Sequence, residues 1–138
     1  MFKFKYLMDL TKVISDNIRV LHRNLIGDNW LTSHERLEEW YKYVDNVQDD
    51  ITEIGIMLGF EESSIREINI DYPSLTQGKK YYEIETLQYV YNFFKDLIKA
   101  MEEVKDDIPA DVYSHLEEYM FYFRKEADYK IKQQLTKK

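Results

Sequence analysis

Four side chains able to bind a metal ion line one side of a segment with strong helical periodicity. They are His34, Glu38, Asp49 and Glu53, and all lie between residues 33 and 55. At roughly 100° per residue they share a sector about 100° wide, almost opposite to the apolar stripe of the same helix. Mixed imidazole and carboxylate ligands suit iron, manganese or zinc, and not copper(I). The pattern predicts a metal site on the outer face of this helix; acids that simply face solvent are the alternative.

A single copy of this helix cannot complete the site. Glu38 and Asp49 are roughly 16 Å apart along the axis, whereas ligand atoms lie about 2 Å from a metal ion. A second, antiparallel copy related by a two-fold axis between residues 43 and 44 places His34 opposite Glu53 and Glu38 opposite Asp49. Because a two-fold interface is self-complementary, we expect two identical sites, each with ligands from both chains.

Four helical segments are expected to position these residues, at about Phe4–Ile26, from residue 32 to 58, at Tyr81–Lys105, and from Pro109 onward. Connections within the first and last pairs are short, whereas residues 60–80 form a longer one. Three isoleucines in this long connection favour a short helix or an ordered strap. One domain, residues 1–138, is expected, with an all-α, ferritin-like four-helix bundle and a long crossover that carries a short helix.

The second helix has the clearest boundary and core signals. We expect Thr32 or Ser33 to be its N-cap, with Glu35 placed for a capping box. Its apolar residues alternate at spacings of three and four, which is typical of near-parallel helix packing. They are Leu37, Trp40, Val44, Val47, Ile51, Ile54 and Leu58.

Composition narrows the class of protein. Hydrophobic residues make up 44% of the chain, while glycine (4) and proline (2) are scarce, which favours a helical protein with a substantial core. The absence of cysteine excludes disulfides and thiolate metal sites. A net charge of −7 disfavours strong nucleic-acid binding. With no secretory signal and no apolar run of transmembrane length, a cytoplasmic protein without membrane contact is expected.

Residues 21–59 resemble the Dps family of mini-ferritins. The resemblance rests on a gapless pattern of ligand-type residues, glycine and tryptophan: His22, Gly27, Trp30, His34, Glu38, Asp49 and Glu53. It extends more weakly to residues 106–112, which resemble the start of the family's fourth helix. The family fold implies a bundle with a short helix in its crossover, and dodecameric hollow shells built from two-fold dimers.

The resemblance also implies a function. His22, His34 and Glu38 of one subunit, with Asp49 and Glu53 of its partner, would form a ferroxidase site. Iron would be oxidised there from Fe(II), often by hydrogen peroxide, and the ferric product would be stored inside the shell. Such chemistry protects against oxidative damage. The expected partner is therefore a second copy of this chain, and the expected metal is iron.

Three departures from the family pattern bear on this expectation. Arg23 stands where the family commonly has tryptophan, and Glu38 stands where aspartate is usual, so a second metal could be shifted or weakened. The first helix begins almost at residue 1, without the basic arm through which some members bind DNA. We therefore expect no strong DNA binding at physiological salt.

Further candidates surround the predicted site. Trp30 could line it and accept oxidising equivalents, or pack at an interface. Asp106, Asp107 and Asp111 would line an acidic pore at a three-fold axis by the resemblance, but helix-start acids that complement the dipole explain them equally well. His115, one turn after Asp111, would face the same pore or solvent.

A non-catalytic helical bundle, serving as a structural or adaptor protein, is the alternative function. Lost ligands would be its signature, whereas all five ligand positions here keep side chains that can bind a metal. The sequence therefore favours the enzyme.

Overall fold

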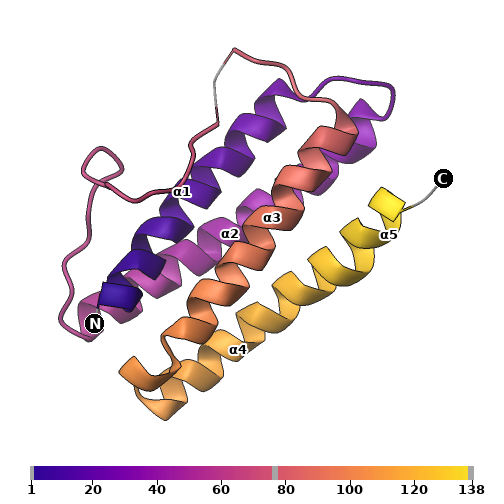
Figure 1. Cartoon of the computed structure of the whole chain (residues 1–138). Coiled ribbons are helices and arrows are strands. Elements are labelled where there is room, and N and C mark those ends of the chain that lie inside the picture. The colour runs from indigo at the N-terminus through magenta and orange to yellow at the C-terminus, as the bar shows by residue number, and fades with distance from the viewer. Residues whose placement is uncertain (1, 76–77, 137–138) are drawn as a thin grey trace.

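The computed structural model describes residues 2–75 and 78–136 of the chain. Long helices dominate it, and their order follows the prediction (Figure 1). They are α1 (Phe2–Asn24), α2 (Trp30–Met57), α3 (Glu83–Glu103) and α4 (Ala110–Arg124), the last continued by the π-helical segment η2 (Lys125–Ile131) and by α5 (Lys132–Thr136). A 3-10 turn, η1 (Lys105–Asp107), links α3 to α4.

These helices form the predicted all-α, ferritin-like bundle. α1 packs along α2 and α3, and the α4–η2–α5 segment packs along α3. Figure 1 shows the connection between α2 and α3 returning along α1 to the far end of the bundle. Among the described residues, no helix is both long enough and apolar enough to cross a membrane.

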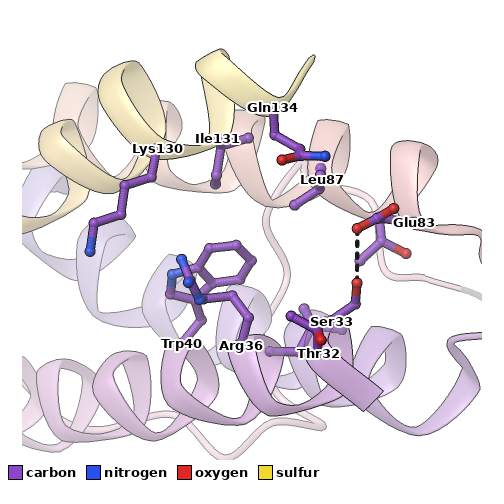
Figure 2. Close-up of a pocket in the computed structure, with 11 residues that line it drawn as sticks. Thr32, Ser33, Arg36, Trp40, Glu83, Leu87, Lys130, Ile131 and Gln134 are labelled. Atoms are coloured by element: carbon purple, nitrogen blue, oxygen red, sulfur yellow. Dashed lines mark hydrogen bonds between the residues drawn. The ribbon is translucent and has the colours of Figure 1, made fainter. Parts of the chain in front are cut away.

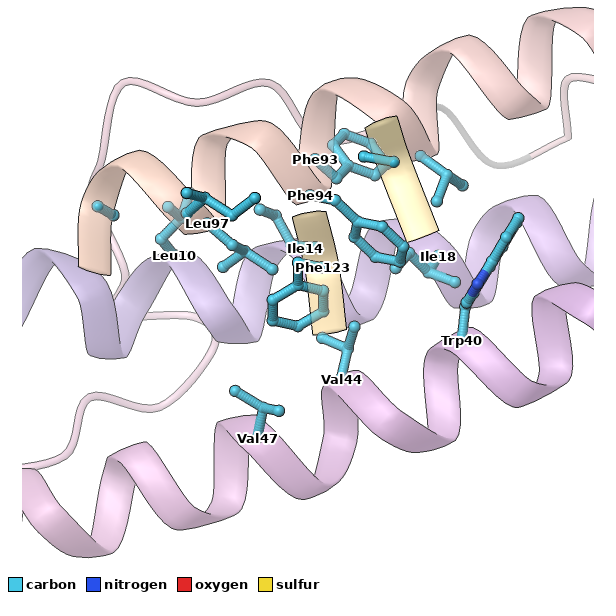
Figure 3. Packing of buried hydrophobic residues seen from close by; sticks show 14 of the residues in the cluster. Leu10, Ile14, Ile18, Trp40, Val44, Val47, Phe93, Phe94, Leu97 and Phe123 are labelled. Carbon is cyan, nitrogen blue, oxygen red and sulfur yellow. The ribbon is translucent and has the colours of Figure 1, made fainter. Parts of the chain in front are cut away.

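The predicted apolar stripes form one core at the centre of the bundle. Figure 3 shows side chains from α1, α2, α3 and α4 meeting there. The stripe residues on α2 from Leu37 to Ile51 are fully buried, while Ile54 and Leu58 lie at its edge. Burying each large side chain contributes about 1.5–3 kcal/mol. This core fixes which face of α2 points inward, and therefore which face remains outside.

The crossover is an ordered strap rather than a short helix. Among its described residues it contains no helix, only short turns such as Ser64–Glu67 and Ile70–Tyr72. Side chains of α1 bind its backbone. The Lys5 ammonium donates to the carbonyl oxygen of Glu61 at 2.8 Å, and the Asn17 side chain bonds the backbone of residues 73 and 75 at 3.0 Å each. These side-chain bonds satisfy strap groups that a helix would have satisfied internally.

The start of α2 differs from the prediction. The helix begins at Trp30, with Asn29 as an N-cap that makes no side-chain capping bond, and not after Thr32 or Ser33. Ser33 instead donates its hydroxyl to Glu83 on α3 at 3.0 Å. A long-range partner for this hydroxyl replaces the local capping bond that the sequence pattern predicted.

Candidate metal centre

Three of the five predicted ligands meet where α1 ends and α2 begins. His22 comes from the last turn of α1, while His34 and Glu38 lie one turn apart near the start of α2. One potential ligand atom from each lies within 4.8 Å of the others, and all three side chains are half-buried. The described part of the chain brings no other three histidine or acidic side chains as close together.

The two histidines are held in a fixed orientation. Their rings stack with centroids 3.9 Å apart. Nδ1 of His34 lies 3.2 Å from the carbonyl oxygen of His22, so this nitrogen carries the proton and donates it. In the neutral tautomer that this bond selects, the lone pair lies on Nε2, the nitrogen that could bind a metal ion. Trp30 stacks on His34 with centroids 4.4 Å apart, which restricts the imidazole further.

The His22 ring is suited to ligation by its environment. Its Nε2 atom is buried, has no hydrogen-bond partner among the described residues, and lies 3.9 Å from a carboxylate oxygen of Glu38. Burial, reinforced by His34, lowers the pKa of His22, so its imidazole is neutral at neutral pH. Buried polar atoms are usually paired. A cation bound between His22 Nε2 and the Glu38 carboxylate would provide a partner for both.

Glu38 already binds a cation of the protein itself. The Lys42 ammonium donates to it at 2.7 Å, and this bond lowers the pKa of Glu38. The carboxylate is therefore ionised, and a bound metal would compete with Lys42. Lysine four residues after the glutamate is a signal that sequence reasoning missed, although the i,i+4 spacing was available.

Asp49 and Glu53 lie outside this cluster. Both are exposed on α2, and Asp49 is roughly 16 Å beyond Glu38 along the helix axis. Asp49 borders an open polar groove beside the ion pair of Arg19 with Asp45. One chain thus brings three of the five predicted ligands together and leaves the other two apart.

Three solved structures share this arrangement of helices. CAIP from Helicobacter cinaedi matches with a TM-score of 0.78 and 19% identity over 97% of each chain. The antigen TpF1 from Treponema pallidum matches with a TM-score of 0.64 and 20% identity, over 92% of this chain and 94% of its own. Dps92 from Deinococcus radiodurans matches with a TM-score of 0.62 and 17% identity, over 91% of this chain and 88% of its own. This chain has the Dps-like fold. No family model and no curated protein matches the sequence, so the likeness is one of fold.

On this Dps-like fold, the candidate pore acids cluster near the turn into α4. Asp106 and Asp107 lie in η1, Asp111 lies in the first turn of α4, and all three are exposed. Their position suits either explanation given for them. A pore would need neighbouring copies, whereas helix N-termini attract acids in any single chain.

His115 has a partner that sequence reasoning missed. Its Nε2 atom lies 2.6 Å from a carboxylate oxygen of Asp50, to which the Tyr119 hydroxyl also donates. His115 and Asp50 are 65 positions apart, and no local spacing connects them. The imidazole is therefore tied to α2 within its own chain.

Proposed function

We propose that this chain is a mini-ferritin that binds Fe(II), oxidises it with hydrogen peroxide at sites shared by two copies, and stores ferric iron in a dodecameric shell. The observation that carries the proposal is the incomplete ligand cluster. His22, His34 and Glu38 converge, while Asp49 and Glu53 lie on the outer face of α2 and join no such group within the described residues.

The outer face of α2 supports a two-fold partner. Four pairs of residues on this face are related by one axis, since the two numbers in each pair add up to 87: Leu31 with Ile56, His34 with Glu53, Glu38 with Asp49, and Lys42 with Asp45. At roughly 100° per residue, all eight fall in one sector of the helix. An antiparallel second copy would bring each residue opposite its counterpart.

The paired chemistries complement each other. Leu31 and Ile56 are 64% and 54% exposed in one chain, and they would cover each other. Lys42 would face an opposite charge, Asp45. Glu38 would face another acid, Asp49, and two facing carboxylates repel unless a cation lies between them. The one unfavourable pairing thus occurs where a metal ion is proposed.

Each ligand would have a distinct role in the reaction. Asp49 and Glu53 would hold the first iron, with His22 and His34 completing its ligands, and Glu38 would contribute to a second. Hard carboxylate oxygens suit iron, and their charge favours Fe(III) over Fe(II). Two Fe(II) ions each give one electron to hydrogen peroxide, whose O–O bond breaks to yield two water molecules as two protons are taken up.

Subunit complementation tests the shared site. One variant carries Asp49→Ala and Glu53→Ala, and the other carries His34→Ala and Glu38→Ala. Each assembles without an intact site, so peroxide-driven Fe(II) oxidation should fall at least about tenfold in both. In shells formed from an equal mixture, half of the dimers are mixed and each regains one of its two sites. We therefore expect about one quarter of wild-type activity.

The outcome separates the models clearly. No recovery in mixed shells, or full activity in either variant alone, would contradict the proposal. A matched double substitution of exposed acids elsewhere, Glu117→Ala with Glu102→Ala, should leave oxidation unchanged. Assembly is checked by mass, since a dodecamer of 16.8 kDa chains has a mass of about 200 kDa.

The second candidate function, a non-catalytic bundle, is favoured by one observation. The Lys42 ammonium already neutralises Glu38 without any metal. If that ion pair persisted in the assembled protein, the group of His22, His34 and Glu38 would stabilise the structure without binding a metal ion. Anaerobic Fe(II) titration distinguishes the two functions, because a structural bundle would take up no more Fe(II) than the Asp49→Ala, Glu53→Ala variant.

A further inference from the structure

Three side chains that can bind a metal ion meet between α2 and α4, outside the predicted metal centre. Asp50 comes from α2, while His115 and Tyr119 lie one turn apart on α4. The Nε2 atom of His115 lies 2.6 Å from Oδ2 of Asp50 and 3.3 Å from the Tyr119 hydroxyl, which itself donates to Oδ2. An imidazole nitrogen, a carboxylate oxygen and a phenol oxygen therefore lie within hydrogen-bonding distance of one another.

The position of this cluster separates it from the other features of α2. At roughly 100° per residue, Asp50 lies about 110° round the helix from the centre of the outer face. It also lies roughly 15 Å along the axis from Trp40, which borders the pocket shown in Figure 2. The cluster is thus distinct from the proposed two-fold contact, and one chain supplies all of it.

The spacing of the three atoms suits an octahedral metal ion. Neighbouring ligands held at about 2.1 Å and at right angles around such an ion lie roughly 3 Å apart. The two separations measured from His115 Nε2, 2.6 Å and 3.3 Å, are close to this value. Small side-chain shifts would therefore place one ion in contact with all three atoms.

An ion could reach the cluster from solvent. The side chains of His115 and Asp50 are 46% and 32% exposed, and Tyr119 is half-buried. The coordination positions that these three residues leave would therefore be open to water.

In the described part of the chain, no lysine or arginine forms an ion pair with Asp50. Its partner is His115, which is charged only when protonated. Both hydrogen bonds described for the carboxylate go to Oδ2, which leaves Oδ1 for a further bond. Glu38 differs, because the Lys42 ammonium already pairs with it. A cation would therefore meet less competition at Asp50 than at Glu38.

The phenol determines which cation fits best. Carboxylate and phenolate are hard anionic oxygen ligands, and imidazole also suits iron. Binding through phenolate requires the ion to displace the phenol proton, which a strongly polarising ion does most readily. Two anionic ligands therefore favour Fe(III) over divalent ions such as Fe(II) or Zn(II), because attraction grows with the charge of the ion.

We propose that Asp50, His115 and Tyr119 form a binding site for Fe(III) within a single chain, separate from the proposed oxidation site. Tyr119 binds as phenolate and releases its proton to solvent. Asp50 binds through a carboxylate oxygen, and His115 binds through Nε2 with its proton on Nδ1. The proposed ferroxidase reaction would supply Fe(III), but the site itself does not depend on that reaction.

Titration with Fe(III), followed by visible absorption, tests the site. An iron(III)–phenolate bond gives a visible charge-transfer band that iron bound only by carboxylate and imidazole lacks. Fe(III) is supplied to the assembled protein as its nitrilotriacetate complex, which keeps the ion in solution. We expect a band that saturates when each chain has taken up a single ion.

Substitution of each ligand should have a distinct result. Tyr119→Phe should abolish the band, because it removes the phenolate oxygen. Asp50→Asn and His115→Gln should each weaken Fe(III) binding at least about tenfold, because each removes one ligand from the ion.

Two other tyrosines provide matched controls. Tyr113→Phe alters a half-buried tyrosine of the same helix and should leave the band unchanged. Tyr41→Phe alters the tyrosine whose ring centroid lies 5.1 Å from that of His22, beside the predicted metal centre, and should also keep the band. A band that disappeared in Tyr41→Phe and remained in Tyr119→Phe would overturn the site.

Measurements on the unaltered protein keep the test decisive if a substitution disturbs folding. Fe(III) uptake without a phenolate band, or no uptake at all, would overturn the proposal. Displacement of Fe(III) by an equal concentration of Zn(II) would overturn the preference for a trivalent ion.

One variant separates this site from the proposed ferroxidase function. Asp49→Ala with Glu53→Ala should retain the phenolate band after addition of Fe(III) while losing Fe(II) oxidation. A band without oxidation in the unaltered protein would contradict only the ferroxidase function, whereas oxidation without a band would contradict only the Fe(III) site.

Discussion

The two opposite faces of α2 differ in how much of their environment one chain supplies. On the inner face, Trp40 is buried, its indole N–H donates to Glu126 at 2.9 Å, and its ring meets Phe94 edge-on at 5.8 Å. On the outer face, His34 and Glu38 are only half-buried and, with His22, form a group of three side chains that could bind a metal ion. The inner face is complete within one chain, whereas the outer face carries exposed apolar groups and unassembled acids.

This difference separates stability from function. Changes on the inner face should alter the free energy of unfolding without altering assembly. Changes on the outer face should alter assembly and iron chemistry with little effect on the fold of each chain. The experiments below test this separation.

The largest effect is expected for Ile56→Glu on the outer face. Ile56 is 54% exposed, so no core contact within the chain is lost. In the proposed dimer the new carboxylate would be buried without a partner, which costs about 3–5 kcal/mol. Size analysis should show smaller species, and peroxide-driven Fe(II) oxidation should fall at least about tenfold in line with that cost.

The control for Ile56→Glu is Phe121→Glu, at an exposed apolar residue on α4. It should keep Fe(II) oxidation, because it leaves the outer face of α2 intact. If Ile56→Glu kept the assembly size and the activity of the unaltered protein, the proposed two-fold contact through the outer face of α2 would be wrong.

An intermediate effect is expected for Glu126→Ala on the inner face. Glu126 accepts the Trp40 indole N–H and pairs with Lys130, so its removal leaves a buried donor unsatisfied. Chemical denaturation should show a loss of about 1–3 kcal/mol. Glu126→Gln, which keeps an acceptor, should lose less, and assembly size should not change.

Glu117→Ala, at an exposed residue of the neighbouring α4, is the comparison for Glu126→Ala and should stay within about 0.5 kcal/mol of the unaltered protein. If the two variants were equally stable, the hydrogen bond between Trp40 and Glu126 would not stabilise the folded chain.

The smallest effect is expected for Asp128→Asn. Asp128 connects η2 to α3 through its bond with Lys95. Lys95 donates to Asp128 at 2.7 Å and lowers its pKa in the folded chain. The stabilisation is therefore fully present above the ordinary aspartate pKa of about 3.9 and is lost as the pH falls through the lowered value. At neutral pH the free energy of unfolding of the variant should be lower by about 0.5–1 kcal/mol, a small value because solvent screens this partly exposed ion pair.

Denaturation of Asp128→Asn and the unaltered protein at several pH values checks the sign. Their difference should shrink as the pH falls through the lowered pKa of Asp128. A difference that grew toward acid would mean that the carboxylate is not stabilised in its ionised form.

Prediction from sequence succeeded where a local pattern decides the structure. The apolar stripe of α2 is buried from Leu37 to Ile51, and the four long helices follow in the expected order. It left open whether the crossover is a short helix or an ordered strap; the structure shows the strap, whose backbone is bonded by the Lys5 and Asn17 side chains. It failed for Ser33, whose hydroxyl bonds Glu83 instead of capping α2. In both places a hydrogen bond to a residue distant in the sequence replaces a local one.

The sequence by itself determined the bundle and the division of α2 into an apolar face and a face that carries acids and an imidazole, because helical periodicity is a local property of the chain. Only the tertiary structure decided that His22 reaches His34 and Glu38, that Lys42 bonds the Glu38 carboxylate, and that η2 brings Glu126 onto Trp40. These contacts join separate turns or separate helices, and the packing of the core sets which of them can meet.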